Sequence, residues 1–238
     1  MNILAVDTSA NVAAAALVSG GKLLAESMLN NKTTHSEKLM PMIDFVLKNS
    51  GMDITDIDLF AVANGPGSFT GLRIGVSTVK GLAHAVNKPI VGISTLAGLA
   101  YNLFETDGLI SPIMDARRSQ VYNAVYKWEK GVFREIAPPR AIALDDCIKE
   151  FENEKKVYFL GDGVPVHKEA IKEKMGDRAV FVPENNLNQR ASSLAVLAEK
   201  KAALSETDDY NSLMPFYLRK PQAEREYEEK HNRKETEK

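Results

Sequence analysis

One short pattern occurs twice in the sequence: an apolar strand that ends in an aspartate and is followed at once by a β-hairpin. Ile3–Val6 leads into Asp7, and about 108 residues later Leu109–Met114 leads into Asp115. A duplicated half-domain is the economical explanation, although two occurrences leave chance open. Strand patterns alternate with helical ones around each copy. This predicts an α/β sandwich in which an antiparallel hairpin joins an otherwise parallel sheet.

Polar side chains follow the first of these strands. Asp7, Thr8 and Ser9 come directly after it, and the carboxyl ends of strands in open α/β sheets are where ligands usually bind. Asp and Ser also cap tight turns by hydrogen bonding to the nearby backbone. The residues alone leave both interpretations, ligand contact and turn cap, evenly open.

A glycine-rich segment, residues 64–75, separates a strand pattern from a helix pattern and carries four glycines and one proline. A strand, a glycine turn and a helix N-terminus can cradle an anion, because unpaired backbone N–H groups point outward there. The spacing matches neither the dinucleotide-binding G-x-G-x-x-G pattern nor the P-loop pattern. The alternative is a tight connection in which glycines allow close packing and Ser68 or Thr70 caps the next helix.

Two helix patterns flank this segment, each with an apolar stripe. Thr34 and Glu37 fit a capping box at the start of the first helix. The two stripes consist of Leu39, Met42, Ile43, Val46 and Leu47 in the first helix and of Leu72, Val76, Val79 and Ala83 in the second. On pattern alone, such stripes cover the sheet of their own domain.

Composition limits the kinds of site that the chain can hold. The formal net charge is −2 without an evident basic stripe, so we expect another subunit to supply most of any grip on RNA. Cys147 is the only cysteine, which excludes an internal disulfide and a cysteine-based zinc cage and favours a packed thiol. His35 has Leu39 four residues later, so a pair of histidine ligands on that helix is not expected.

Two further features concern location and the end of the chain. The sequence shows no run of 18 apolar residues and no signal-peptide pattern, which predicts a cytoplasmic protein that does not bind the membrane. Residues 221–238 carry 11 charged side chains among 18 residues. Such a composition cannot form a core, so we expect a flexible charged tail there.

Five segments carry a resemblance to a known family. In chain order they are Ile3-Leu4-Ala5-Val6-Asp7-Thr8-Ser9, His35-Ser36-Glu37 with Leu39-Met40-Pro41, Gly65-Pro66-Gly67-Ser68-Phe69-Thr70-Gly71-Leu72-Arg73-Ile74-Gly75, Asp115-Ala116-Arg117-Arg118, and Pro215-Phe216-Tyr217-Leu218-Arg219-Lys220-Pro221-Gln222-Ala223-Glu224. On these segments, the glycine-rich one being the most specific, the chain resembles the TsaB (YeaZ) family. That family lies within the sugar-kinase/actin/Hsp70 (ASKHA) superfold.

The resemblance implies a fold and its division into parts. The fold is α/β: a two-lobed, actin-like arrangement of duplicated ribonuclease-H-like halves with mixed sheets and flanking helices. Residues 1–105 would form the first lobe, joined by a helix over residues 190–205. Residues 106–220 would form a smaller, degenerate second lobe, and residues 221–238 the tail.

The resemblance also implies a function. TsaB proteins are non-catalytic partners of the TsaD-type threonylcarbamoyltransferase, which forms N6-threonylcarbamoyladenosine at position 37 of tRNAs reading ANN codons. This chain would then be an inactive paralogue that activates a TsaD-like protein, joins a TsaE-like ATPase and forms a homodimer when alone. It would meet tRNA only through the complex, and it would need no catalytic residue, metal or cofactor of its own.

Two sets of residues follow from the resemblance. The partner or dimer surface would be helical and carry Leu39, Met42, Ile43, Val46, Leu72, Arg73, Val76 and Val79. The vestigial nucleotide-facing residues would be Asp7, Thr8, Ser9, Asp115, Gly161 and Gly163.

Two other functions fit the sequence less well. An active ATP-binding phosphotransferase or ATPase of the same superfold needs a general base near the acceptor, and the sequence offers no convincing one. A metallopeptidase, a label attached to this family through an old "glycoprotease" name, needs a metal site. The four histidines, His35, His84, His167 and His231, lack ligand spacing.

Overall fold

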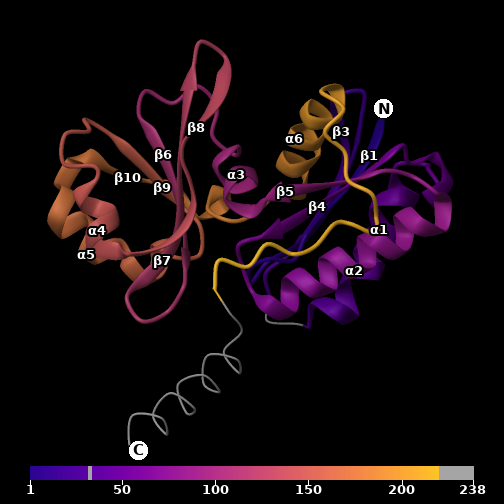
Figure 1. Ribbon diagram of the computed structural model, residues 1–238, viewed down its shortest axis with the longest axis horizontal. Helices are drawn as coiled ribbons and strands as arrows, with labels where there is room; N and C mark the ends of the chain where they lie inside the picture. The colour runs from indigo at the N-terminus through magenta and orange to yellow at the C-terminus, as the bar shows by residue number, and fades with distance from the viewer. Residues whose placement is uncertain (32–33, 220–238) are drawn as a thin grey trace, which may run out of the picture.

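The computed structural model describes residues 1–31 and 34–219. The charged tail predicted for residues 221–238 lies outside the described residues. The chain forms two lobes side by side, each built on a five-stranded sheet (Figure 1).

The first sheet has β1 at its centre. Its strands are β1 (Asn2–Asp7), β2 (Ala13–Ser19), β3 (Lys22–Leu29), β4 (Leu59–Gly65) and β5 (Ile90–Ser94), in the order β3-β2-β1-β4-β5. The β1, β2 and β3 strands pair antiparallel, whereas β4 runs parallel to β1 and β5 runs parallel to β4. This is the predicted hairpin on an otherwise parallel sheet.

The second sheet repeats this topology. Its strands are β6 (Leu109–Asp115), β7 (Gln120–Glu129), β8 (Val132–Ala143), β9 (Val157–Leu160) and β10 (Ala179–Phe181), in the order β8-β7-β6-β9-β10. The central β6 is antiparallel to β7 and parallel to β9, as β1 is to β2 and β4. The strand-aspartate-hairpin pattern therefore marks two copies of one unit, which confirms the predicted duplicated, actin-like fold.

Three helices cover the first sheet: α1 (His35–Asn49), α2 (Phe69–Val86) and α6 (Ala191–Ala203). Side chains alternate between the two faces of a strand. Leu4 and Val6 of β1 therefore pack with α1 and α2, whereas Ile3 and Ala5 pack with α6 on the opposite face. The sheet is buried on both sides, as its near-continuous apolar strands require.

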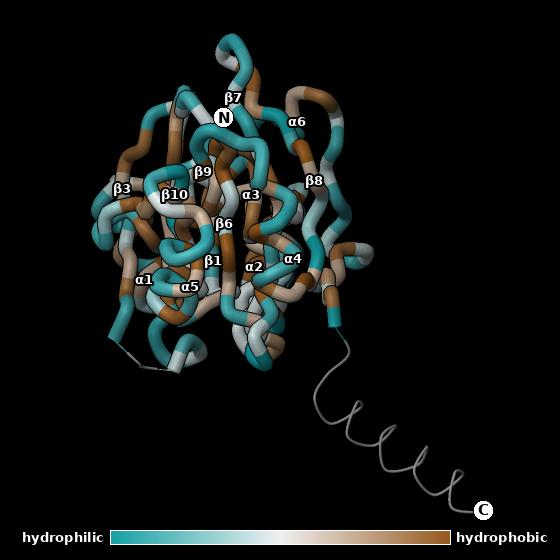
Figure 2. The backbone as a smooth tube through the Cα atoms, turned by 90° about the vertical axis from the view of Figure 1, so that its left-hand side faces the viewer, coloured by the Kyte–Doolittle hydropathy of each residue, from teal (hydrophilic) through white to brown (hydrophobic). Residues whose placement is uncertain are grey.

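The remaining helices are α3 (Thr95–Ala100), α4 (Leu144–Lys149) and α5 (Val164–Met175), with short 3-10 turns η1 (Ile54–Asp56), η2 (Gly176–Arg178) and η3 (Glu184–Asn186). Figure 2 shows hydrophobic residues concentrated along the strands and hydrophilic ones in the connections.

The predicted capping box of α1 is wrong: Thr34 is the N-cap residue, but its side chain makes no capping hydrogen bond.

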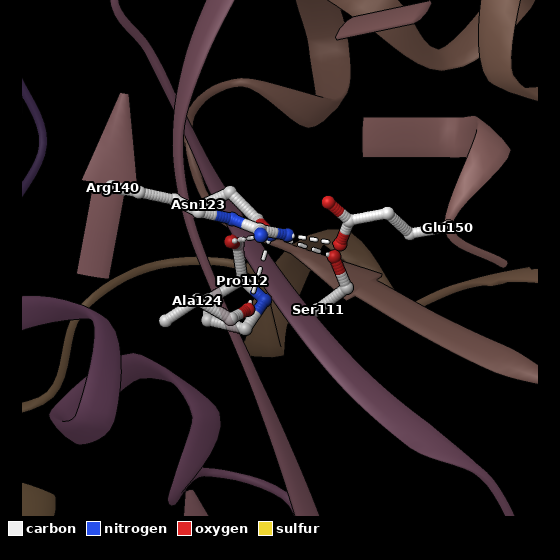
Figure 3. Close-up of polar contacts among 6 residues, drawn as sticks. All are labelled: Ser111, Pro112, Asn123, Ala124, Arg140 and Glu150. Atoms are coloured by element: carbon white, nitrogen blue, oxygen red, sulfur yellow. Dashed lines mark hydrogen bonds and ion pairs between the residues drawn. The ribbon is translucent and has the colours of Figure 1, made fainter. Parts of the chain in front are cut away.

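A buried polar cluster lies within the second lobe (Figure 3). Asn123 is fully buried, and its Nδ2 donates to Oγ of Ser111 at 2.9 Å and to two backbone carbonyls. Arg140 donates to Oδ1 of Asn123 at 3.3 Å and pairs with Glu150. Since these bonds satisfy both Nδ2 and Oδ1 of the Asn123 amide, the cluster is a structural one.

Nearby Cys147 is buried as predicted, and burial raises the pKa of its thiol to about 12.

One side-chain amide connects the two segments in which the chain passes from one lobe to the other. Asn102, in the first crossing, donates through Nδ2 to the carbonyl oxygen of Asn188 in the second crossing at 2.9 Å. Its Oδ1 accepts from the hydroxyl of Ser193 on α6 at 2.7 Å. The two crossings are therefore tied to each other and to the first lobe.

After α6 the chain returns across the first lobe as an irregular segment, residues 205–219, which we call the C-terminal strap (Figure 1). Asp208 pairs with Ile90 at the edge of β5, and Leu213 is buried in the first core. Further on, the backbone N–H of Phe216 donates to the carbonyl oxygen of Asn64 at 2.6 Å. The strap thus borders the glycine-rich segment.

Candidate functional site

The glycine-rich segment closes over the turn that follows β1. The backbone N–H of Ser68 donates to the carbonyl oxygen of Ser9 at 2.7 Å. A β-carbon on Gly67 would lie 2.3 Å from that oxygen, and one on Gly71 would lie 2.0 Å from the carbonyl oxygen of Thr8. Only glycine can approach another backbone this closely. The segment is therefore a packing joint between α2 and β1, which is the second of the two interpretations of its glycines.

Three backbone N–H groups at the start of α2 are bonded within the chain. Ser68 is the N-cap residue, and its side chain accepts from the backbone N–H of Gly71 at 3.3 Å. Its carbonyl oxygen accepts from Leu72 at 2.8 Å, and its own N–H is bonded to Ser9. These three N–H groups are not available to an anion, which weakens the case for a phosphate cradle.

Asp7, the last residue of β1, and the two residues after it, Thr8 and Ser9, are buried in this joint, each at most 1% exposed. Oδ1 of Asp7 accepts from the backbone N–H of Ser9 at 2.9 Å and from its hydroxyl at 2.5 Å. The hydroxyl of Thr8 donates to the carbonyl oxygen of Gly71 at 2.7 Å. These contacts cap the turn and fix it to α2, so the turn-cap interpretation agrees with the structure.

Burial raises the pKa of Asp7 to about 6. Hydrogen bonds from Ser9 and the positive charge of His35 oppose this rise, whereas the negative charge of Asp162 adds to it. Asp162 follows β9 in the second lobe. Acidic groups of the two lobes therefore influence each other across their junction.

The matching edge of the second sheet carries two acids and a histidine. Burial raises the pKa of Asp162 to about 6, and the Asp115 carboxylate adds to that rise. Oδ1 of Asp115 accepts from the backbone N–H of Arg117 at 2.9 Å and lies 3.7 Å from Nε2 of His167. Within the described residues, Oδ1 of Asp162 and Nε2 of His167 have no hydrogen-bond partner. Sequence reasoning missed His167 as a member of this site, because its spacing to the other residues gives no signal.

The two glycines predicted to face a nucleotide contact β6. The backbone N–H of Gly163 donates to the carbonyl oxygen of Ile113 at 3.1 Å. Gly161 lies against the same carbonyl group. Of the six predicted nucleotide-facing residues, Asp115 alone is exposed.

Three acidic side chains lie near the junction between the two lobes: Asp7, Asp115 and Asp162. Asp7 interacts with Asp162, and Asp162 with Asp115, through their charges. In the part of the chain that the structure describes, no three histidine, cysteine, aspartate or glutamate side chains form a group that could hold a metal ion. The contacts of Asp7, Thr8 and Ser9 form the turn and hold it to α2 within the first lobe.

Comparison with known proteins places the chain in a family. A curated relative from Bacillus subtilis, named tRNA threonylcarbamoyladenosine biosynthesis protein TsaB, is 38% identical over 94% of this chain and 96% of its own length. The chain belongs to the TsaB family. A protein of the same name from Haemophilus influenzae is 28% identical over 92% of this chain and 94% of its own length. The predicted TsaB membership is thereby confirmed.

Two further matches extend this TsaB assignment. Residues 22–227 match the family model described as TsaD: tRNA N6-adenosine threonylcarbamoyltransferase. The solved structure of YeaZ from Pseudomonas aeruginosa aligns with a TM-score of 0.78 and 27% identity, covering 91% of this chain and 99% of its own. Among the described residues, no helix combines the length and apolarity needed to cross a membrane.

In this TsaB-family chain, the apolar stripes of α1 and α2 face their own sheet. The seven apolar residues predicted for a partner surface are at most 3% exposed: Leu39, Met42, Ile43, Val46, Leu72, Val76 and Val79. Arg73 alone of the predicted eight is exposed. The expectation that the seven apolar side chains themselves contact a partner is therefore corrected. They fill the core of the first lobe, which is the outcome that the stripe pattern alone favours.

The outward faces of the same two helices carry other side chains. On α1, Met40 and Phe45 are 48% and 52% exposed. On α2, Gly81 lies in the middle of the helix and is exposed to solvent. A β-carbon added there would meet nothing within 4 Å. A mid-helix glycine costs about 1 kcal/mol relative to alanine. Among the described residues, no contact requires glycine at this position.

Proposed function

We propose that this chain takes part in forming threonylcarbamoyladenosine in tRNA as a non-catalytic partner that activates a TsaD-type threonylcarbamoyltransferase. The pathway comes from the names of its relatives. The observation that carries the non-catalytic role is the closed turn after β1, where Asp7, Thr8 and Ser9 are buried and bonded within the chain. An ATP-using enzyme needs groups open to the transferred phosphate and its metal.

A second argument supports an inactive paralogue. The family resemblance implies that TsaD proteins hold their metal with a His-x-x-x-His pair on a helix. In this chain the position four residues after His35 is Leu39, which is buried in the core. Nε2 of His35 lies 2.8 Å from the carbonyl oxygen of Ala10. His35 therefore links the start of α1 to the turn between β1 and β2.

The partner surface in this proposal is the outward side of α1 and α2. Met40 and Phe45 are large apolar side chains exposed to solvent on α1, and in this proposal each makes an apolar contact with the partner. The same surface would pair two copies of this chain when the TsaD-type protein is absent. A TsaE-like ATPase would join the assembled pair in the cytoplasm.

The test is reconstitution with purified proteins. Modified adenosine in tRNA is measured with a TsaD-type paralogue, a TsaE-type ATPase and the threonylcarbamoyl adenylate that donates the group, with and without this chain. ATP hydrolysis is measured for this chain alone. We expect strong stimulation by the chain and no hydrolysis above background without its partners. Full activity of the paralogue without this chain would overturn the proposal, and so would magnesium-dependent ATP hydrolysis by the chain alone.

A further inference from the structure

Three segments that are distant in the sequence bring four arginines together where the C-terminal strap contacts α2 and the β6–β7 turn. Nε of Arg73, on the first turns of α2, donates to the hydroxyl of Tyr217 in the C-terminal strap at 3.1 Å, although 144 residues separate them. Further along the strap, Arg219 donates to the carbonyl oxygen of Ala116 in the β6–β7 turn, 103 residues away. The next two residues of that turn are also arginines. We call this set the arginine arc: Arg73, Arg117, Arg118 and Arg219.

The arc carries positive charge that the described residues do not neutralise. Within residues 1–31 and 34–219, none of its four guanidinium groups forms an ion pair with a carboxylate, whereas Arg134 pairs with Glu129 at 3.1 Å and Arg190 with Glu26 at 3.5 Å. Asp115 lies on the same turn, but its recorded partners are a backbone N–H and His167. The net charge of −2 for the whole chain thus conceals a local cationic group.

Aromatic rings lie between these arginines. The rings of Phe69 and Tyr217 stack with centroids 4.3 Å apart, and the guanidinium of Arg219 lies 5.6 Å from the ring centre of Tyr122. Phe216, beside Tyr217, is 47% exposed. Guanidinium groups alternating with accessible rings are typical of surfaces that hold phosphates and stack on unpaired bases.

We infer that the arginine arc binds the phosphodiester backbone of RNA, so that this chain contacts the RNA directly. The inference rests on the proposed function, which supplies RNA as the shared substrate of the assembly. It differs from the expectation that tRNA is reached only through the complex. Arginine without a carboxylate partner suits phosphate better than an apolar protein surface, because its fork of donors matches phosphate oxygens. Single-stranded loops suit the adjoining rings.

The experiment measures RNA affinity at the arc with charge as the variable. A fluorescently labelled RNA hairpin shaped like an anticodon arm is titrated with the full chain, alone and in complex with the TsaD-type paralogue, from about 50 to 200 mM KCl. The test variant is Arg117→Gln with Arg118→Gln, the charge-retaining variant is Arg117→Lys with Arg118→Lys, and the control is Arg134→Gln. Circular dichroism checks that each variant is folded.

We expect the double glutamine variant to bind RNA about tenfold more weakly, with a dependence of log affinity on log salt that is shallower by about 2. The double lysine variant should keep most of the affinity, and Arg134→Gln should match the wild type. Equal affinity and equal salt dependence for wild type and the double glutamine variant, in both the lone chain and the complex, would overturn the inference.

Binding to the paralogue, measured with the same variants, separates this inference from the proposed function. Loss of paralogue binding with unchanged RNA affinity would make the arc a protein contact and would also overturn the inference. RNA binding that depends on the arc, in a chain that fails to stimulate the paralogue, would support the inference while the proposed function fails.

Discussion

The carbonyl oxygen of Thr8 stands 2.0 Å from the point where a side chain on Gly71 would begin. Gly71→Ala must therefore displace the turn after β1 or the first turn of α2, together with the hydrogen bond from the Thr8 hydroxyl to Gly71. Because the clash is with backbone, we expect the free energy of unfolding to fall by about 3 kcal/mol or more. Urea denaturation followed by circular dichroism measures it.

The matched control is Gly81, a glycine in the interior of the same helix. A β-carbon on Gly81 would meet nothing within 4 Å, so Gly81→Ala should raise the stability of the isolated chain by up to about 1 kcal/mol through helix propensity. Similar unfolding midpoints for the Gly71 and Gly81 variants would contradict the packing role of the glycine-rich segment.

Asp7 gives stability a defined dependence on pH. Its folded pKa of about 6 lies above the ordinary value of 3.8, so the folded state binds the proton more tightly between these values. The contribution of this group is complete below about pH 4 and is lost as the pH rises through about 6, by roughly 3 kcal/mol as an order of magnitude. Asp7→Asn keeps an oxygen acceptor for Ser9 but cannot ionise.

The measurement compares the free energies of unfolding of wild type and Asp7→Asn at several pH values. We expect the wild type to lose stability relative to the variant as the pH rises from about 4 to about 7. A difference that stays constant over this range would show that the carboxyl is not protonated in the folded chain.

Phe45 tests the partner surface without touching the core. It is 52% exposed on α1, so Phe45→Glu should leave the fold intact while placing a charge in an apolar contact. We expect association with the TsaD-type paralogue, measured by calorimetry, to weaken at least tenfold, a loss of about 1.4 kcal/mol. The control is Val166→Glu, at a side chain 60% exposed on α5 in the second lobe. Equal binding by both variants would remove α1 from the interface.

Tyr217 tests how the C-terminal strap is held. Its ring stacks on Phe69 at 4.3 Å and its hydroxyl accepts from Arg73. Tyr217→Phe keeps the stacked ring, whereas Tyr217→Ala removes both contacts and should cost about 1 kcal/mol more, the scale of an aromatic pair. Hydrogen exchange at the backbone N–H of Phe216 is the readout. Equal exchange in both variants would show that the stacking does not fasten the strap.

Much of the fold was predictable because its signals are local. The apolar strand into Asp7 and its second copy into Asp115 identified two equivalent sheet centres, and the resemblance on the glycine-rich segment supplied the family. The same local signals placed Ser68 among the candidate caps of α2. Periodicity and turn chemistry act over a few residues and can be read without the tertiary structure.

The site was less predictable because its contacts are not local. A stripe such as Leu39 to Val46 is equally apolar whether it meets a sheet or a partner, and only the structure shows that it meets the sheet. The arginine arc depends on a contact between Arg73 and Tyr217 across 144 residues. Nothing in the spacing of these arginines along the sequence indicates that the three segments that carry them lie together.

The tie that Asn102 makes between the two crossings has a thermodynamic consequence for assembly. Its two hydrogen bonds hold Asn188 and Ser193 beside Asn102 in the free chain. A movement that separates the two crossings must break these bonds, at a net cost of about 1 kcal/mol each. A partner that contacts both lobes therefore meets crossings whose relative position is already restrained, and less of the binding free energy is lost in ordering them.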